Sequence, residues 1–424
     1  MQRSHVVRPA AMFWGLTAFL PVGVNYLAAL LMLLALLFAG GWRVRAERLR
    51  SNPMWWPVTL FVVWTLVVLS LEPQYPETGS NLVHGLRIAA TVLMALSLTR
   101  QEALWGMRGF WLIGLANLVI IALYYTVGFP QPEALRGVLR EVGNKSISNA
   151  LLFTIMAASA AVYALRAVSA RRPLRALPAV ALIGAVVAVA AFSLHSRTSL
   201  LALLIAMAGA CAHQWRGRLK VLVPVLLIGG AVAAAGLWTL PPVQQKFELG
   251  VKEIEEAQAG AVSEGSWVVR FYMYRDTARM IIDRPFAGWG IGGWTEQWHL
   301  RGPKLLADYN MPHNDFLWMG SQAGVPGSLS LMLIVLTAVV LSWRRRDLAG
   351  RHAFAATLVM LVATSLNSAL RDAQIGLALL WVAMNYLRLA QLPGGEPWQE
   401  LLPRRPAAAQ APGFNDGGAQ PRLP

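Results

Sequence analysis

The sequence has few charged residues and almost no cysteine. Only 14% of its 424 residues are charged, whereas an ordinary soluble domain has about 25%. Uncharged runs such as residues 14–42 and 316–343 exceed the roughly 20 apolar residues that a helix needs to cross a bilayer. The single cysteine, Cys211, excludes an internal disulfide and a metal site built from several cysteines. These shortages exclude a soluble domain and predict an all-α, polytopic membrane protein.

Several enzyme motifs are also missing. The sequence has no Walker A motif, no Asp-x-Asp pair that would hold a divalent metal on a sugar nucleotide, and no zinc-ligand spacing. Residues 288–293 formally match a dinucleotide-binding fingerprint, but they follow Arg284-Pro285 and do not join a strand to a helix. We interpret them as a turn, and we expect no metal and no cofactor.

The hydropathy pattern predicts about twelve transmembrane helices. Residues 1–240 carry nine of them, residues 241–322 form a long loop, and residues 323–392 carry the other three. Residues 393–424 are rich in Pro, Ala and Gly, so we expect a disordered tail. The predicted spans are residues 10–21, 23–41, 54–71, 82–98, 104–128, 147–167, 177–194, 198–214, 221–240, 323–343, 353–370 and 374–391.

Arginine-rich clusters orient these spans. In a twelve-span protein, four such clusters fall on one side together with both termini, and positive residues mark the cytoplasmic side. We therefore expect a bacterial inner-membrane protein whose long loop faces the periplasm. The net charge of +16 also favours a polyanionic partner, but basic residues scattered among spans argue against nucleic acid. The clusters comprise Arg43, Arg45, Arg48 and Arg50; Arg166, Arg171, Arg172 and Arg175; Arg216, Arg218 and Lys220; and Arg344, Arg345, Arg346 and Arg351.

The long loop is the first place to look for function. A connection of this length is usually functional, although it is too short for an independent enzyme domain. Residues 267–282 mix aromatic, aliphatic and basic side chains, a composition typical of a helix that lies on a membrane surface. We expect the loop to be helical and to carry part of a site.

His313 lies where this loop enters the next apolar helix, within Pro312-His313-Asn314-Asp315. The positive end of a helix dipole disfavours imidazolium, and a neutral imidazole is what a general base requires. The residues leave three roles open for His313: a general base, a group that orients a substrate, or an interfacial histidine held by a neighbour.

Arginines on the same predicted side are candidate anion ligands. Arg197 lies in a very short link, where topology requires no arginine, and a guanidinium matches phosphate oxygens with two parallel hydrogen bonds. Arg270 and Arg275 lie on the predicted loop helix, and Arg301 lies closer to His313. Binding to lipid headgroups is the alternative for each. For Arg371-Asp372, in another short link, we expect a local ion pair.

Gly324 and Gly327 follow His313 in Gly324-Val325-Pro326-Gly327. Pro326 should break or bend the helix, and small residues let helices approach closely. We expect this segment to hold His313 in place and to take no part in chemistry.

Together these residues resemble a known family. His313-Asn314, nine intervening residues, and then Gly324-x-x-Gly327 resemble the signature of the O-antigen ligase and polymerase superfamily. Arg197 in a Ser-Arg link, and Arg270 opening a helix that ends at Pro285, are similar to the family pattern as well. The motifs cover residues 190–345, and topology alone supports the rest.

The resemblance implies an inverting, metal-independent glycosyltransferase with a GT-C-like membrane architecture. Its donor would be an O-antigen on undecaprenyl diphosphate, and its acceptor a sugar of lipid A–core, with membrane lipids around both. Arg197 and Arg270 would clamp the diphosphate with support from Arg275 or Arg301, and His313 would take the acceptor proton, with Asn314, Gly324 and Gly327 in supporting positions.

The residues leave the acceptor open. An O-antigen polymerase and a pilin-directed oligosaccharyltransferase share the same arginines and histidine. A transporter of lipid-linked glycan is the alternative from another class, but it would not need a base at the loop–helix junction, and the expected repeats are not seen.

Overall fold

A computed structural model describes residues 5–128, 144–239 and 241–393. Within these ranges the chain is helical and contains no strand. Ten helices are long and apolar enough to cross a membrane, or eleven if the bent pair α3–α4 counts as one more span. The predicted all-α, polytopic class is therefore confirmed. Residues 394–424 of the expected tail (393–424) and most of the loop before residue 147 lie outside the described residues.

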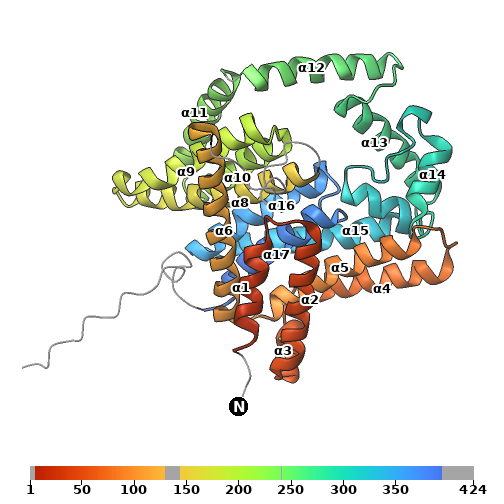
Figure 1. Ribbon diagram of the computed structural model, residues 1–424, viewed down its shortest axis with the longest axis horizontal. Coiled ribbons are helices and arrows are strands. Elements are labelled where there is room, and N and C mark those ends of the chain that lie inside the picture. The colour runs from red at the N-terminus through yellow and green to blue at the C-terminus, as the bar shows by residue number, and fades with distance from the viewer. Residues whose placement is uncertain (1–4, 129–143, 240, 394–424) are drawn as a thin grey trace, which may run out of the picture.

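Apart from the long loop and the connection between α6 and α8, most of which lies outside the described residues, the helices follow one another with short connections (Figure 1). In chain order they are α1 (Val7–Thr17), α2 (Val22–Ala39), α3 (Trp42–Arg50), α4 (Trp55–Leu71), α5 (Thr78–Ser97), α6 (Arg100–Val127), α8 (Asn144–Ser169), the short 3-10 helix η1 (Pro173–Ala176), α9 (Leu177–Ala188), the π-helical turn η2 (Val189–Ser193), α10 (Arg197–Trp215), α11 (Leu219–Trp238), α12 (Pro241–Gln258), α13 (Ser266–Asp283), α14 (Gly293–Arg301), η3 (Lys304–Leu306), α15 (Asp315–Arg344), α16 (Leu348–Leu366) and α17 (Ala373–Gln391).

The structure has fewer candidate spans than the twelve transmembrane helices predicted, and the difference lies at the first of them. Helix α1 has 11 residues, so it is about 17 Å long and too short to cross a hydrocarbon core of about 30 Å. It packs beside α6 and α2 (Figure 1), and Trp14 stacks on Trp381 with ring centroids 4.0 Å apart. Close packing against α6 depends on glycine, because a Cβ on Gly15 would lie 2.1 Å from the carbonyl oxygen of Gly106.

The core of the bundle is formed by α16 and α17, which lie in its middle (Figure 1). Within their apolar stretches, 83% and 89% of the residues are buried. Both helices are rich in alanine, and small side chains let neighbouring helices approach closely. Helices α5, α8, α10 and α15 pack around this pair, so the loop between α16 and α17 is held on several sides.

The long loop is helical, as the sequence indicates, and has a small core of its own. Helices α12, α13 and α14 form most of it, and Trp294 and Trp298 of α14 stack with ring centroids 5.4 Å apart over buried Met273 and Met280 of α13. The loop ends earlier than residue 322, because α15 begins at Asp315.

Helix α15 is interrupted at Ala323 and Gly324, whose backbone angles are not helical. Pro326 has no N–H for the carbonyl of Gln322, and that carbonyl instead accepts the N–H of Gly290 (3.0 Å). Other segments therefore form hydrogen bonds with the backbone groups that the interruption leaves unpaired, as a break within a membrane requires. The contacts that complete it are Trp289 N to Ser321 O (2.8 Å), Val325 N to Pro285 O (2.7 Å) and Trp64 Nε1 to Ala323 O (2.7 Å).

Residues 288–293 are thus the turn that the sequence predicts, and their function is to cover the break in α15. Gly324 has φ +68° and ψ −173°, a region that only glycine adopts without strain. A Cβ there would lie 2.1 Å from the carbonyl oxygen of Phe286. The glycine is needed both for its conformation and for the approach of this turn.

Gly324→Ala should therefore destabilise the protein, by about 2–4 kcal/mol for backbone strain and lost docking together. Gly23→Ala in α2 is the matched control, because a Cβ at Gly23 meets nothing within 4 Å and alanine favours a helix. The unfolding temperatures of both variants in detergent test this. A Gly324→Ala protein that unfolds with the wild type would contradict the prediction.

Candidate active site

The residues around His313 fasten the start of α15 to the loop after α16. Asn314 caps the helix, since its Oδ1 accepts the N–H groups of Phe316 (2.9 Å) and Leu317 (3.0 Å). Its Nδ2 donates to the carbonyl of Ser365 (2.8 Å). His313 precedes this cap in a left-handed conformation, with φ 54°. The conformation turns the chain just before α15 begins and sets the position of the imidazole.

Asp315 makes the second connection to the same loop. Its buried carboxylate accepts the N–H groups of Leu370 (2.8 Å) and Arg371 (2.9 Å). From α5, Nη2 of Arg87 donates to the carbonyls of the same two residues (2.7 and 2.6 Å). Two side chains of opposite charge thus pair with the N–H and carbonyl groups of this backbone segment, and they hold Arg371 in a fixed position.

Arg371 is a cation that the sequence did not single out as a site residue. Its side chain is 6% exposed, Nη1 donates to Oδ1 of Asn310 (3.2 Å), and Nε is buried without a hydrogen-bond partner. Burial lowers the pKa of Arg371. The expected local ion pair with Asp372 does not describe it, because its guanidinium reaches Asn310 while Asp372 caps α17 through the N–H of Ile375 (3.0 Å).

Arg197 and Arg270 are brought together by one serine. Nη2 of Arg197, at the start of α10, donates to Oγ of Ser266 (2.8 Å). Nη1 of Arg270 donates to the carbonyl of the same serine (3.3 Å), and its Nη2 lies 3.5 Å from Oδ1 of Asn367. Burial lowers the pKa of Arg270, and the charge of Arg197 lowers it further. Two cations held close to one another form a candidate site for an anion.

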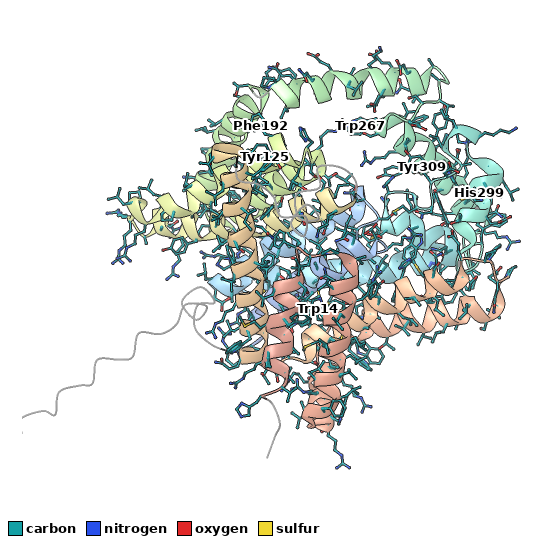
Figure 2. The ribbon with its side chains drawn as sticks, in the orientation of Figure 1. Trp14, Tyr125, Phe192, Trp267, His299 and Tyr309 are labelled. Carbon is teal, nitrogen blue, oxygen red and sulfur yellow. The ribbon has the colours of Figure 1, made fainter. Side chains whose placement is uncertain are left out.

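His313 lies within reach of these charges and is neutral at pH 7. Burial lowers its pKa to about 4, with smaller contributions from Arg270 and Arg371. Burial and two arginines therefore act in the direction that the sequence predicts from the helix dipole, toward a neutral imidazole. The hydroxyl of Tyr274 donates to the carbonyl of His313 (3.0 Å), and the ring of Tyr309 lies edge-on to the imidazole at 6.2 Å. Figure 2 shows Tyr309 and Trp267 on the part of the molecule formed by α13 and α14.

Arg275 and Arg301 are not part of this cluster. Arg275 donates to both carboxylate oxygens of its neighbour Asp276 (2.7 and 3.0 Å). Arg301 is paired with Asp283 and lies over the ring of Trp289 at 4.6 Å. Both arginines already have carboxylate partners, and their predicted role in donor binding stays a prediction.

Gly324 and Gly327 lie at the break in α15, and Gly324 is about 14 Å along the helix from its start at Asp315. A Cβ on Gly327 would lie 2.5 Å from that of Ala323. Their contacts are with the broken turn and not with the cluster of Arg197, Arg270, His313 and Arg371, which we call the cationic cluster.

The cationic cluster lies at one end of several spans, and the arginine-rich segments lie at the other. Arg197 begins α10, whereas Arg216 follows its last residue, Trp215. Helix α15 begins beside His313 and ends at Arg344, and α16 begins after Asp347 and ends at Leu366. Among the described residues, no three His, Cys, Asp or Glu side chains are grouped so as to hold a metal ion.

Sequence reasoning also missed Tyr274, Ser266 and Asn367, which have no signal beyond their residue type. Arg371 did have a signal in the sequence. It is an arginine in a short link at the end of the spans opposite the arginine-rich clusters, the same pattern that identified Arg197.

The fold defines a polytopic membrane protein, and the cationic cluster is a candidate site at one end of its spans. Residues 180–332 match the family described as O-antigen ligase, and this segment contains Arg197, Arg270 and His313. The match covers the segment that carries the motifs of the resemblance, and it supports a function of the ligase or polymerase type. No curated protein matches the chain. Arg371 lies outside the matched segment.

The low pKa of His313 predicts a pH dependence of stability. The pKa is about 4 in the folded protein and near 6.5 in an unfolded chain. As the pH falls below 6.5 the unfolded state gains a proton that the folded state does not, so stability falls between pH 6.5 and 4. His313→Gln should lose less of its unfolding temperature than wild type between pH 7.5 and 5. Equal losses would contradict the low pKa.

Proposed function

We propose that this protein is an O-antigen ligase, which transfers O-polysaccharide from undecaprenyl diphosphate to lipid A–core by an inverting, metal-independent reaction. The observation that carries the proposal is the cationic cluster itself: two arginines joined through Ser266, beside a neutral histidine. The family match supports the reaction type, and the choice of ligase within that type is our own inference.

The two arginines are suited to the diphosphate of the donor. Both arginines donate hydrogen bonds to Ser266, and Arg270 also donates one to Asn367. Glu253 lies within electrostatic range of both, but its Oε2 accepts the N–H of Trp267 (2.7 Å). Guanidinium groups bind phosphate oxygens through paired hydrogen bonds, so two adjacent arginines match the two phosphates of a diphosphate. The same contacts stabilise the leaving group as negative charge develops on it.

His313 would act as the general base. The acceptor hydroxyl attacks the anomeric carbon, its proton passes to an imidazole nitrogen, and the bond from that carbon to the diphosphate oxygen breaks. A histidine with a pKa of about 4 is a weak base in the free protein. A bound diphosphate offsets the charges of Arg270 and Arg371, which lower this pKa. Donor binding therefore raises the basicity of His313 and prepares it for the acceptor.

The ends of the helices support the expected orientation. The arginine-rich segments cluster away from the site, and positive residues favour the cytoplasm. The site then faces the periplasm of a bacterial inner membrane, with the lipid tail of the donor in the bilayer. A polymerase would use the same geometry with a second lipid-linked glycan as acceptor.

The function is tested by a transfer assay with purified protein, lipid-linked O-antigen, lipid A–core and EDTA. We expect wild type to form slow-migrating lipopolysaccharide and His313→Ala to form none, because the base is gone. His299→Ala is the matched control, since this exposed histidine lies on α14 at the edge of the molecule (Figure 2). Longer glycan from the donor alone would make the protein a polymerase, and loss of activity with EDTA would contradict the metal-independent reaction.

Arginine replacements separate the two expected roles. Arg197→Lys keeps the charge but loses the paired hydrogen bonds, so we expect roughly 100-fold slower transfer. Arg371→Lys should lose less, because Arg371 acts on His313 through its charge. Arg279→Lys is the control, since this side chain is 65% exposed and pairs with Asp276. Near-normal transfer by Arg197→Lys would contradict the diphosphate clamp, and an equal loss in Arg371→Lys would mean direct hydrogen bonding to substrate.

A further inference from the structure

A second cationic site lies at the opposite end of the spans from the cationic cluster. The ends of α8 and α10 and the start of α16 enclose a pocket of about 370 Å³. Two of its lining residues are joined, since Nε2 of Gln214 donates to Oγ of Ser169 (2.9 Å). The pocket is lined by Ser169, Gln214, Trp215, Gly217, Arg218 and Arg351.

Several arginines from separate helices converge on this pocket. Arg166 of α8 and Arg216, just after α10, lie close enough to Arg351 for their charges to repel. Arg351 donates to Gln214, and Arg216 donates to the carbonyl of Trp343 (2.7 Å). One guanidinium nitrogen of each, Nη2 of Arg216 and Nε of Arg351, is buried without a hydrogen-bond partner.

Within the described residues, none of the salt bridges involves Arg216, Arg218 or Arg351, so acidic side chains in that part of the chain do not pair with these three arginines. Asp347 is within electrostatic range of Arg351, but its carboxylate accepts from Arg345 (2.7 Å) and caps α16. An anion from outside the chain is therefore favoured at this point.

The positive-inside rule explains why arginines are on this side but not why they surround a pocket. Topology requires only that charges stay on one side of the membrane, and separate solvated side chains satisfy it. The surface beside the pocket is apolar, with Val168 54% and Leu219 66% exposed. Helix α11, which begins at Leu219, has none of its apolar stretch buried.

We propose that this pocket binds the head group of an anionic phospholipid. The phosphate would lie among Arg218, Arg351 and their neighbours, and the acyl chains would lie along the exposed apolar surface that begins at Leu219. Basic pockets between transmembrane helices bind such head groups through this combination of charge and lipid-facing surface. The proposal does not depend on the transferase reaction.

The test is native mass spectrometry of the delipidated full-length protein, titrated with phosphatidylglycerol or phosphatidylcholine of identical acyl chains. We expect phosphatidylglycerol to bind about tenfold more tightly. Arg218→Gln/Arg351→Gln should weaken its binding roughly 30-fold, the factor expected for two lost arginine–headgroup contacts. Arg344→Gln/Arg346→Gln removes the same charge from the same end of the spans, outside the pocket, and should change binding less than about threefold.

Three results would overturn the proposal. Equal weakening by both double variants would mean that only diffuse charge matters. Equal binding of the two lipids would show that the pocket does not recognise an anionic head group. Displacement of phosphatidylglycerol by millimolar inorganic phosphate would identify a site for a free anion. If the double variant does not fold, Arg218→Gln alone changes an exposed residue between α10 and α11, and about fivefold weaker binding is expected.

Discussion

The carboxylate of Asp315 determines the geometry of the candidate site. It accepts hydrogen bonds from two backbone N–H groups of the loop between α16 and α17, while Arg87 donates to the carbonyls of the same residues. Because α16 and α17 form the buried core, this loop cannot move without them. The start of α15, and with it His313, is therefore fixed relative to the loop that carries Arg371, whose charge acts on His313.

The site is governed by repulsion as much as by attraction. Arg197 and Arg270 come from different parts of the chain, and hydrogen bonds to Ser266 hold them close together. The charge of Arg197 lowers the pKa of Arg270, so the protein bears a cost for bringing these like charges together. His313 remains neutral mainly because it is buried, and the charges of Arg270 and Arg371 add to this effect.

The sequence predicted the membrane class and three of the four cluster residues, because a bilayer restricts where charge can lie. Arg197 and His313 stood out as polar residues at helix ends on the side without arginine-rich clusters. The sequence did not show that Arg275 is paired with Asp276, since ion pairing depends on side-chain placement. Residue spacing likewise did not show that Arg371 lies near His313. Helix α1 was predicted to be a transmembrane span because its apolar run continues to Pro21.

The interruption in α15 has a consequence for how the protein is made. Its open carbonyls are satisfied by the turn at residues 288–293 and by Trp64, which lie far apart in the chain. Until the long loop has docked, this helix would expose unpaired backbone groups to lipid. Completion of the last spans is thereby linked to folding of the loop, so a nascent chain acquires its candidate site and its finished transmembrane bundle in the same step of biogenesis.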